Sequence, residues 1–308
     1  MTWHSGQQAE GKTILITGAN AGIGYFAAEQ LAANGATVVL GCRDTAKGDL
    51  AVRAIRARVP SARLRCVRLD LADLSALPAT VDALDADRLD AVVLNAGVLL
   101  SGPDRRMSAQ GHELMFATNH LGHFALVAQL APILTATANS RVITVGSFAA
   151  RSERLDLTDL QSEHDYRPKR SYGRSKLAQM LFGFELDRRL RAHAAGTTSM
   201  VVHPGGALDS LTPSRPPLFI RTTAQRLRGL PASVALHGKH AGAETLVRAV
   251  LDTEITGGQL WGPRVFGLRG QPHREAPHAH MTDLDTAAGL WAASSALTGV
   301  DPLGVGSA

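Results

Sequence analysis

Tyr172 and Lys176 stand four residues apart in the stretch SYGRSKLAQ at 171–179. Four residues make about one helical turn, so in a helix both side chains leave the same face. A tyrosine titrates at about pH 10, and a neighbouring ammonium group lowers that pKa because it favours the phenolate. Such a phenol could serve as a general acid or base closer to neutral pH. The alternative is an ordinary surface pair on an amphipathic helix, and the spacing alone does not separate the two interpretations.

A helix is predicted to carry this pair, since apolar residues recur after it at helical spacing. Upstream, short apolar runs alternate with amphipathic stretches, a pattern typical of βαβ units. We therefore expect an α/β protein with a single-domain Rossmann fold: a doubly wound parallel sheet of about seven strands, with helices on both faces. The strands are expected at 12–18, 36–42, 63–70, 89–97, 140–147, 198–205 and 257–263.

Helices are expected between these strands, and Gly35 is the expected C-terminal cap of the first. Ser108 is the expected N-cap of a long helical region. The expected ranges are 23–34, 45–58, 73–86, 107–134, the helix of Tyr172, 240–252 and 283–297. Two stretches are irregular: a polar loop at 148–170, and a Pro-rich segment at 206–239 that we interpret as a lid. One domain over 1–308 results, with a core at about 12–263 and a C-terminal extension at 264–308.

The composition indicates a soluble globular protein, with 45% apolar and 19% charged residues in 308. No apolar run reaches the ~20 residues of a membrane span. The polar start MTWHSGQQAEGK lacks a signal core, and Cys42 and Cys66 are interpreted as reduced, so a cytoplasmic location is expected. The net charge is +5, but the basic residues are scattered and aromatic residues are only 5%. The densest basic cluster, at 188–193, is interpreted as a solvated helix face, and no nucleic-acid binding is expected.

The turn TGANAGIG at 17–24 follows the first expected strand and opens the first helix. Its glycines Gly18, Gly22 and Gly24 form a variant of the dinucleotide fingerprint. Small residues let the backbone approach a pyrophosphate, and the helix directs its partially positive N-terminus at that group. A glycine turn without a ligand is the alternative.

The end of the second strand, LGCRD, bears on the choice of cofactor. A carboxylate there would bind the adenosine ribose diol, whereas an arginine accommodates a 2′-phosphate. Cys42 occupies the place of the acid and Arg43 follows, with Lys47 in reach. This favours NADP over NAD, although Asp44 could bind the ribose or simply cap the next helix. Asp70 and Asn95 are placed at carboxyl ends of strands, where ligands bind in parallel sheets, or are loop caps.

Taken in order, these motifs resemble the short-chain dehydrogenase/reductase family over about residues 12–263. The resemblance rests on the glycine turn, Asp70, Asn95-Ala96-Gly97, Asn119, Ser147, Tyr172 with Lys176, and His203-Pro204-Gly205. The stretches GCRDTAKG and YGRSKLAQMLFGFEL resemble the branch of retinol dehydrogenases, WW-domain oxidoreductase and protochlorophyllide reductase.

The resemblance implies a role for each catalytic residue. Tyr172 would pass a proton to or from the substrate oxygen, Ser147 would hydrogen-bond the carbonyl, and Lys176 would hold the nicotinamide ribose and lower the tyrosine pKa. Asn119 would shape its helix so that a water relays protons behind Lys176. It further implies a homodimer or homotetramer and cofactor contacts from Gly18, Asn20, Gly22, Ile23, Gly24, Arg43, Asp70, Leu71, Asn95, Ala96, Gly97, Tyr172, Lys176, Pro204 and Gly205.

The chain departs from the family pattern in one informative place. Many relatives carry a threonine five residues after the proline of Pro204-Gly205, where it contacts the nicotinamide amide. Here that position is Asp209, with Ser210 and Thr212 nearby, so the contact stays open.

Several histidines and aromatic residues have less specific interpretations. His120 and His123 lack a completing carboxylate or cysteine, so no metal site is expected there. The tail histidines His273, His278 and His280 are interpreted as parts of a solvated loop. An apolar substrate pocket could be lined by Trp261, Phe266 and Trp291 together with Leu218 and Phe219 of the lid segment, or these side chains could pack in the core.

The function expected from these features is NADP(H)-dependent interconversion of a carbonyl and an alcohol on a lipophilic or polycyclic small molecule. The Ala-, Arg- and Gly-rich composition suggests a high-GC bacterial source and a specialised-metabolite ketone. The alternatives are a catalytically silent NADP-binding regulator or scaffold, and a reductase of carbon–carbon double bonds. The complete set of Asn119, Ser147, Tyr172 and Lys176 favours an enzyme, because a sensor needs none of these four together.

Overall fold

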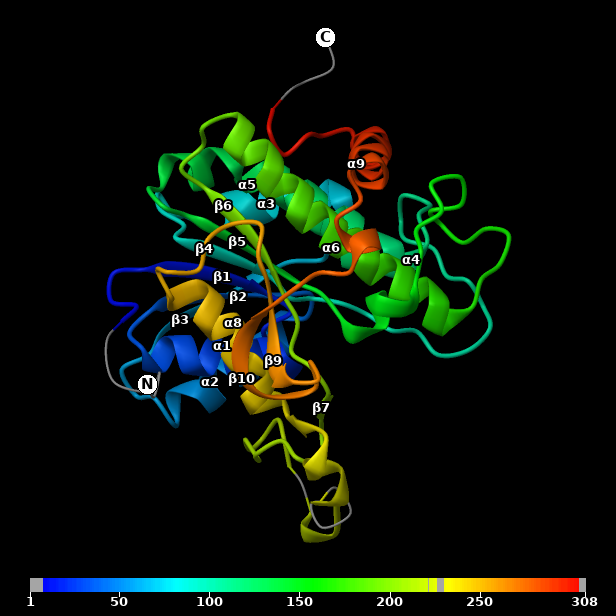
Figure 1. Cartoon of the computed structure of the whole chain (residues 1–308). Coiled ribbons are helices and arrows are strands. Elements are labelled where there is room, and N and C mark those ends of the chain that lie inside the picture. Colours follow the sequence, from blue (N-terminus) through cyan, green and yellow to red (C-terminus); the bar gives the residue numbers. More distant parts are fainter. Residues whose placement is uncertain (1–7, 221, 226–229, 305–308) are drawn as a thin grey trace.

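The computed structural model describes residues 8–220, 222–225 and 230–304. The first seven residues of the expected polar start, and residues 221 and 226–229 of the expected lid, lie outside this part. One eight-stranded sheet forms the centre, in the order β10-β9-β6-β5-β4-β1-β2-β3. All neighbours are parallel except the edge pair of β10 with β9, so the α/β doubly wound expectation is confirmed (Figure 1). The strands are β1 Thr13–Thr17, β2 Thr37–Cys42, β3 Arg63–Arg68, β4 Ala91–Leu94, β5 Arg141–Val145, β6 Thr198–Val202, β9 Leu260–Val265 and β10 Arg269–Glu275.

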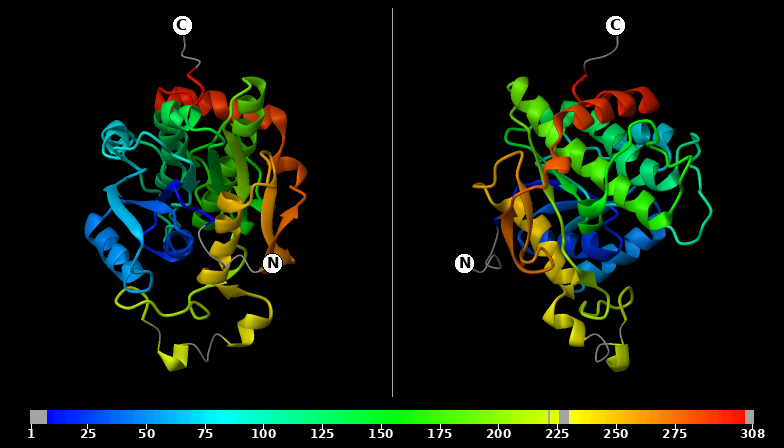
Figure 2. Two further views of the ribbon diagram at one scale, coloured as in Figure 1. Left: turned by 90° about the vertical axis from the view of Figure 1, so that its left-hand side faces the viewer. Right: turned by 45° about the vertical axis from the view of Figure 1, so that its right-hand side comes forward.

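The two faces of the sheet bury separate apolar cores. Side chains alternate across a strand, so Ile14 and Ile16 of β1 face one core while Leu15 faces the other. Helices α1, α2 and α8 cover the first face, and α3, α5 and α6 cover the second, with α9 packed over α6 (Figures 1 and 2). The helices are α1 Gly22–Ala33, α2 Thr45–Arg56, α3 Leu77–Asp82, α4 Leu114–Phe116, α5 Gly122–Ala136, α6 Pro168–Ala192, α8 Lys239–Leu251 and α9 Leu284–Thr298.

Local signals set several helix ends as expected. Gly35 follows α1 with φ +91°, a left-handed conformation that glycine adopts without steric cost. Asp44 caps α2 by accepting a hydrogen bond from the Lys47 backbone N–H at 3.1 Å, which is one of the two roles expected for this residue. The helix expected at 73–86 is shorter, because a 3₁₀ turn at Leu74–Ala76 precedes α3, which has a proline in its first turn.

The long helix expected from residue 107 begins later, and Ser108 is not its N-cap. Residues 107–113 form a loop closed by a bridge between Met107 and Glu113, with Gly111 at φ +78°. Helix α4 starts at Leu114 because the buried Glu113 carboxylate accepts hydrogen bonds from the Met115 and Phe116 N–H groups. A π-helical turn, Ala117–Leu121, then leads into α5.

Strand β10 was not expected, and the interpretation of His273 as part of a solvated loop is wrong. The stretch RGQPHRE lacks alternating apolar residues and contains Pro272, which cannot donate to a central ladder. At the edge of the sheet that loss is tolerated, and the register shifts between Arg269 and Pro272. His273 pairs with Gly262 of β9.

The segment expected to be a lid is anchored at both of its ends. Strands β7 (Ala207–Leu208) and β8 (His237–Gly238) pair in parallel, so the chain leaves and re-enters the body at one place. Figure 1 shows the intervening segment projecting at the bottom of the molecule, away from α9.

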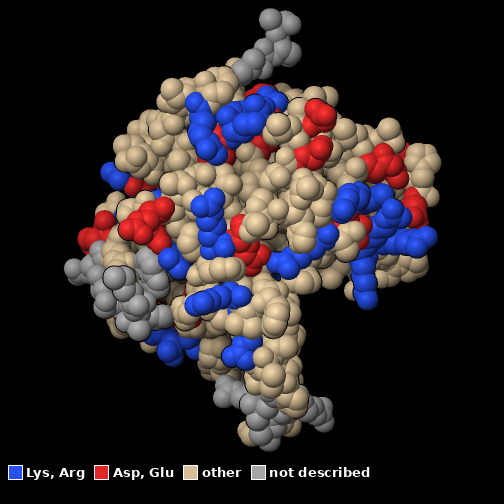
Figure 3. Space-filling view, viewed as in Figure 1, with Lys and Arg blue, Asp and Glu red and all other residues tan. Residues whose placement is uncertain are grey.

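The basic cluster at 188–193 lies on the last turns of α6 and is neutralised within the helix. Arg188 and Arg189 both pair with the buried Glu185 carboxylate, and Arg191 pairs with Asp187. Figure 3 likewise shows basic side chains in separate patches with acidic ones among them on the visible face. Among the described residues, no helix combines the length and apolar character needed to cross a membrane.

Candidate functional site

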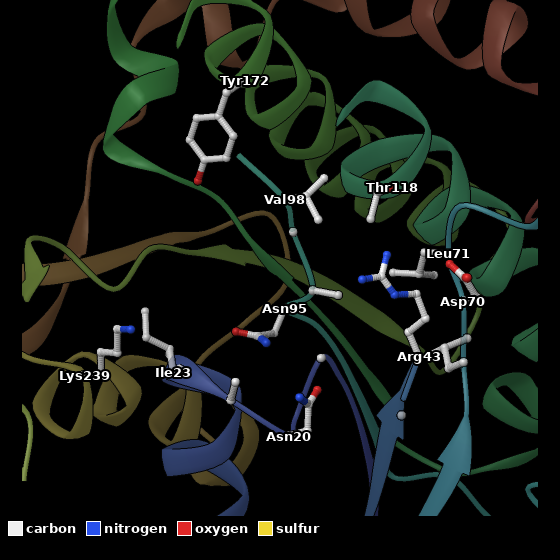
Figure 4. A pocket seen from close by; sticks show the side chains of 17 residues that line it. Asn20, Ile23, Arg43, Asp70, Leu71, Asn95, Val98, Thr118, Tyr172 and Lys239 are labelled. Carbon is white, nitrogen blue, oxygen red and sulfur yellow. The ribbon is translucent and has the colours of Figure 1, made fainter. Parts of the chain in front are cut away.

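Two adjoining cavities open at the carboxyl ends of the parallel strands. The larger has a volume of about 580 Å³ and the smaller about 300 Å³. They share the lining residues Ile23, Asn95, Gly97 and Tyr172, so they lie side by side. Every parallel strand from β1 to β6 ends in a segment that lines one of them, which is where an open α/β sheet binds ligands. In Figure 4, Arg43 and Asp70 lie on one side of the larger cavity, Ile23 and Lys239 on the other, and Tyr172 above.

The glycine turn is packed too tightly to carry side chains at two positions. A Cβ on Gly24 would lie 2.4 Å from Asn95 Nδ2, and one on Gly18 would lie 3.0 Å from Ala96 Cα. Ala21, the N-cap of α1, provides no capping hydrogen bond from its side chain. The backbone at the start of α1 can therefore approach a phosphate closely, so the donors present fit a dinucleotide. Asn20, Gly22 and Ile23 all line the larger cavity.

Asn95 and Thr17 fix the turn to the end of β4. Asn95 Nδ2 donates to the Thr17 carbonyl at 2.8 Å, and Thr17 Oγ1 accepts from the Asn95 and Ala96 N–H groups at 2.9 and 2.8 Å. Asn95 thus has a structural contact besides its place in the cavity wall. Ala96 and Gly97 line the cavity beside it.

The far end of the larger cavity carries an arginine and lacks a carboxylate on β2. Cys42, the last residue of β2, is fully buried, and exposed Arg43 lines the cavity with Asp70 and Leu71. Lys47 is not among the lining residues, and its Nζ lies 3.4 Å from Asp44 Oδ2. Of the two cations considered near this strand, Arg43 is the one at the cavity.

Tyr172, Ser147 and Lys176 line the smaller cavity together. The long helix α6 positions Tyr172 and Lys176 one turn apart, as expected. Burial raises the pKa of the Tyr172 phenol, and a hydrogen bond from Ser147 opposes that rise. The lysine-induced lowering of this pKa that the resemblance implied is therefore not found in this structure.

The Lys176 ammonium group is buried and is bound by groups on β5 and α6. Its Nζ donates to the Val145 carbonyl at 3.0 Å and to Gln179 Oε1 at 2.8 Å. Burial lowers the pKa of Lys176 to about 7. Gln179 in turn donates to the Leu94 carbonyl at 2.9 Å, so this residue, which the sequence analysis did not single out, orients the ammonium group.

Asn119 lies on the π-helical turn and is fully buried. Its Oδ1 accepts from the Val98 N–H at 2.7 Å, and its Nδ2 donates to Ser175 Oγ at 2.9 Å. A Cβ on Gly97 would lie 3.2 Å from Asn119 Oδ1 and 3.3 Å from Lys176 Nζ. The glycine therefore leaves the space in which these two side chains approach each other.

Pro204 and Gly205 line the smaller cavity beyond β6. Gly205 has φ +69°, and a Cβ there would lie 2.6 Å from the Leu268 carbonyl oxygen, so only glycine fits. The three candidates for the missing threonine contact, Asp209, Ser210 and Thr212, are absent from both cavity linings. Thr212 instead accepts from the Lys239 N–H at 2.9 Å.

The aromatic residues considered for a substrate pocket lie elsewhere. Trp291 is buried against Phe124, with ring centroids 5.2 Å apart, and Phe219 packs 5.1 Å from the Tyr25 ring. Phe266 is 84% exposed. Helical spacing and residue type could not show this, because the partners come from α1 and α5, far away in the sequence.

His120 and His123 are buried and form hydrogen bonds within the core of the molecule. His120 Nε2 lies 2.7 Å from Ser294 Oγ of α9, and His123 Nε2 lies 2.9 Å from Thr17 Oγ1. Burial lowers the pKa of both to about 3, so both are neutral at physiological pH. Among the described residues, no three metal-ligating side chains gather in one place.

Lys239 and Thr118 line the larger cavity and were not predicted. Lys239 is the first residue of α8, about two hundred positions after the glycine turn, and Thr118 sits beside Asn119. Of these two residues, only Thr118 had a signal in the sequence, because it directly precedes Asn119, which was predicted for the site.

Comparisons with known proteins identify the family. Residues 12–158 match the model described as short chain dehydrogenase. The chain is 38% identical over 207 residues to mouse retinol dehydrogenase 12, covering 67% of this chain and 64% of that protein. It is 32% identical over 297 residues to human retinol dehydrogenase 13, covering 94% of this chain and 86% of that protein. The chain belongs to the short-chain dehydrogenase/reductase family.

The expected similarity to the retinol dehydrogenase branch is confirmed by these relatives. This short-chain dehydrogenase/reductase spans just under two thirds of the mouse protein's length. A crystal structure of a protein from Mycobacterium paratuberculosis is 32% identical and covers 95% of each chain, with a TM-score of 0.76. The family consists of oxidoreductases that use nicotinamide cofactors, and the glycine turn described above fits that group.

Proposed function

We propose that this protein is an NADP(H)-dependent oxidoreductase that interconverts a ketone or aldehyde and an alcohol. The observation that carries the cofactor choice is Arg43, which lines the adenosine end of the larger cavity, where β2 ends in buried Cys42 and not in a carboxylate. An arginine can bind a 2′-phosphate through two parallel hydrogen bonds, whereas a carboxylate would repel it. Asp70 and Leu71 would border the adenine, and the turn from Gly18 to Gly24 would hold the diphosphate.

When bound, the nicotinamide would supply or accept the hydride. In the reductive direction Ser147 would donate a hydrogen bond to the substrate carbonyl oxygen, and Tyr172 would donate the proton that this oxygen gains. Burial raises the pKa of the Tyr172 phenol, so the phenol is protonated at neutral pH in the free protein but is a weaker acid than a solvated tyrosine. Lys176, Asn95, Pro204 and Gly205 would hold the nicotinamide half.

A lipophilic substrate is supported by apolar side chains near the smaller cavity. Leu99 is 57% exposed and lines that cavity, and Phe148, which directly follows Ser147, is 42% exposed. Exposed apolar residues beside a candidate reaction centre are typical of sites that bury hydrophobic ligands.

Calorimetric titration with NADPH and NADH tests the cofactor assignment. Arg43→Ala is expected to weaken NADPH binding by about tenfold to a hundredfold and to leave NADH binding nearly unchanged, since only NADPH carries the 2′-phosphate. Lys47→Ala is the matched control, because it removes a nearby cation that does not line the cavity. Equal losses for both cofactors in Arg43→Ala would remove the assignment.

A second variant tests the proposed role of Tyr172 as the proton donor in ketone reduction. Tyr172→Phe removes the proton donor and keeps the ring, so reduction of a lipophilic ketone should fall by about a hundredfold or more. NADPH binding should be retained within about twofold. Turnover that survives this change would contradict the mechanism, and a wild-type protein that binds NADPH without reducing any of a broad ketone panel would favour a silent binding protein.

A further inference from the structure

Lys239 brings a positive charge to the wall of the larger cavity. Three basic side chains line the two cavities in the described part of the chain: Arg43 at the adenosine end, Lys176 at the Tyr172 end, and Lys239 with Ile23. Figure 4 shows Lys239 beside Ile23, on the side of the larger cavity opposite Arg43. Ile23 lines both cavities, whereas Lys239 lines the larger one.

Helix α8 sets this position by packing against α1. Gln30 Nε2 of α1 donates to the His240 carbonyl at 2.9 Å, which ties the first turn of α8 to the helix that follows the glycine turn. The Lys239 N–H is held by Thr212 Oγ1, and the preceding Gly238 pairs with Leu208 across the β7–β8 ladder. The base of the lid therefore fixes the lysine backbone at the wall of the cavity.

The Lys239 side chain is one-quarter exposed and already carries one anionic partner. Its Nζ lies 2.8 Å from Asp209 Oδ1, and the relative exposures of the two side chains are 23% and 57%. Asp209 itself lines neither cavity. An ammonium group has three donors, so a second anion can bind from the cavity side without displacing the aspartate.

The glycine turn offers a diphosphate backbone donors but no cation. Lys239 is the basic residue that lines the cavity beside the start of α1. We propose that Lys239 binds the phosphate of the cofactor diphosphate that is nearer the nicotinamide. The β7–β8 ladder at the base of the lid would then be part of the cofactor site through this lysine. This proposal rests on the proposed function, because it presupposes that the cavity binds a dinucleotide.

The competing explanation is that Lys239 only ties the lid to α8 through Asp209. A purely structural pair would change the melting temperature without discriminating among ligands that differ in their phosphates. A contact with the diphosphate discriminates, because it is lost only by ligands that contain that group.

Calorimetry with three ligands on Lys239→Met separates the two explanations. NADPH and 2′-phospho-ADP-ribose both contain the diphosphate, whereas 2′,5′-ADP contains separate monophosphates and lacks the nicotinamide-side phosphate. We expect about tenfold weaker binding of the first two ligands and less than about twofold change for 2′,5′-ADP. Lys239→Arg keeps the charge and should bind all three ligands within about threefold of wild type.

Lys12→Met is the control for net charge, since Lys12 precedes β1 at the amino end of the sheet, away from the cavities. It should bind all three ligands like wild type. The proposal is overturned if Lys239→Met binds the diphosphate ligands normally, or if it weakens all three ligands equally while the fold is intact by thermal melting. A wild-type protein that binds neither NADPH nor NADH would instead overturn the proposed function itself.

Discussion

Arg215 reaches from the lid to α1 and forms a buried ion pair with Glu29. Arg215 Nε lies 2.6 Å from Glu29 Oε2, and Arg215 Nη2 lies 2.7 Å from Glu29 Oε1. The two residues are 8% and 5% exposed. The Tyr25 hydroxyl lies 3.4 Å from the same carboxylate, and Arg58 Nε lies 3.7 Å from it. This pair joins the lid to the helix that follows the glycine turn.

Replacing Arg215 with Met would leave the Glu29 carboxylate buried without its bidentate partner. Breaking one side of a buried pair costs about 3–5 kcal/mol. Tyr25 and the half-exposed Arg58 remain beside the carboxylate and offset part of that cost. We therefore expect Arg215→Met to lower the free energy of unfolding by about 2–4 kcal/mol.

Urea unfolding measures this loss, and two further variants make the comparison specific. Glu29→Met combined with Arg215→Met should recover most of the lost stability, because no unpaired charge then remains buried. Arg58→Met is the matched control and should cost less than about 1 kcal/mol, since Arg58 is largely solvated. A loss below about 1 kcal/mol in Arg215→Met, or a double variant no more stable than the single one, would refute the reasoning.

Two other predictions concern charged groups near the cavities. Lys176 has a pKa of about 7 in the folded protein, so below pH 7 both states hold the proton and the burial penalty is fully present. As pH rises from 7 towards about 10, only the unfolded state keeps the proton, so wild type should gain about 1.4 kcal/mol per pH unit relative to Lys176→Met. Urea unfolding of both proteins at pH 7 and 8.5 measures this, and a pH-independent difference would contradict it. Glu275 of β10 contacts Arg151 at 2.9 Å and His203 at 3.1 Å, joining the 3₁₀ helix Phe148–Ser152 after Ser147 to the end of β6 before Pro204. Glu275→Gln should lower kcat by roughly tenfold, because these two segments are displaced, and should leave NADPH affinity unchanged. The control Glu254→Gln should change neither kcat nor NADPH affinity. An unchanged kcat in Glu275→Gln would exclude this positioning role.

The parallel core could be predicted because its signals are local. Strands buried on both faces appear as continuous apolar runs, and β1, β2 and β5 lie within the ranges expected for them. Tyr172 and Lys176 share a face for a similar reason, since helical geometry alone determines it. The spacing of the turn glycines after the first strand identified them, and the structure shows that a side chain at Gly18 or Gly24 would clash with Ala96 or Asn95.

The errors arose where a distant segment decides the structure. Residue type could not show that Pro272 lies on an edge strand, since that depends on β10 returning beside β9. Nor could it show that Phe219 packs against Tyr25 of α1, almost two hundred residues earlier.

By itself, the sequence determined the succession of the parallel strands β1 to β6, the glycine turn and the side chains available for proton transfer, because each depends on neighbours within a few residues. Only the tertiary structure decided the protonation behaviour of these side chains and which residues lie beside them in the cavities. Burial raises the pKa of Tyr172 and lowers that of Lys176, and the packing of α8 on α1 brings Lys239 to the cavity. Desolvation and long-range contacts are properties of the assembled fold, so no local pattern encodes them.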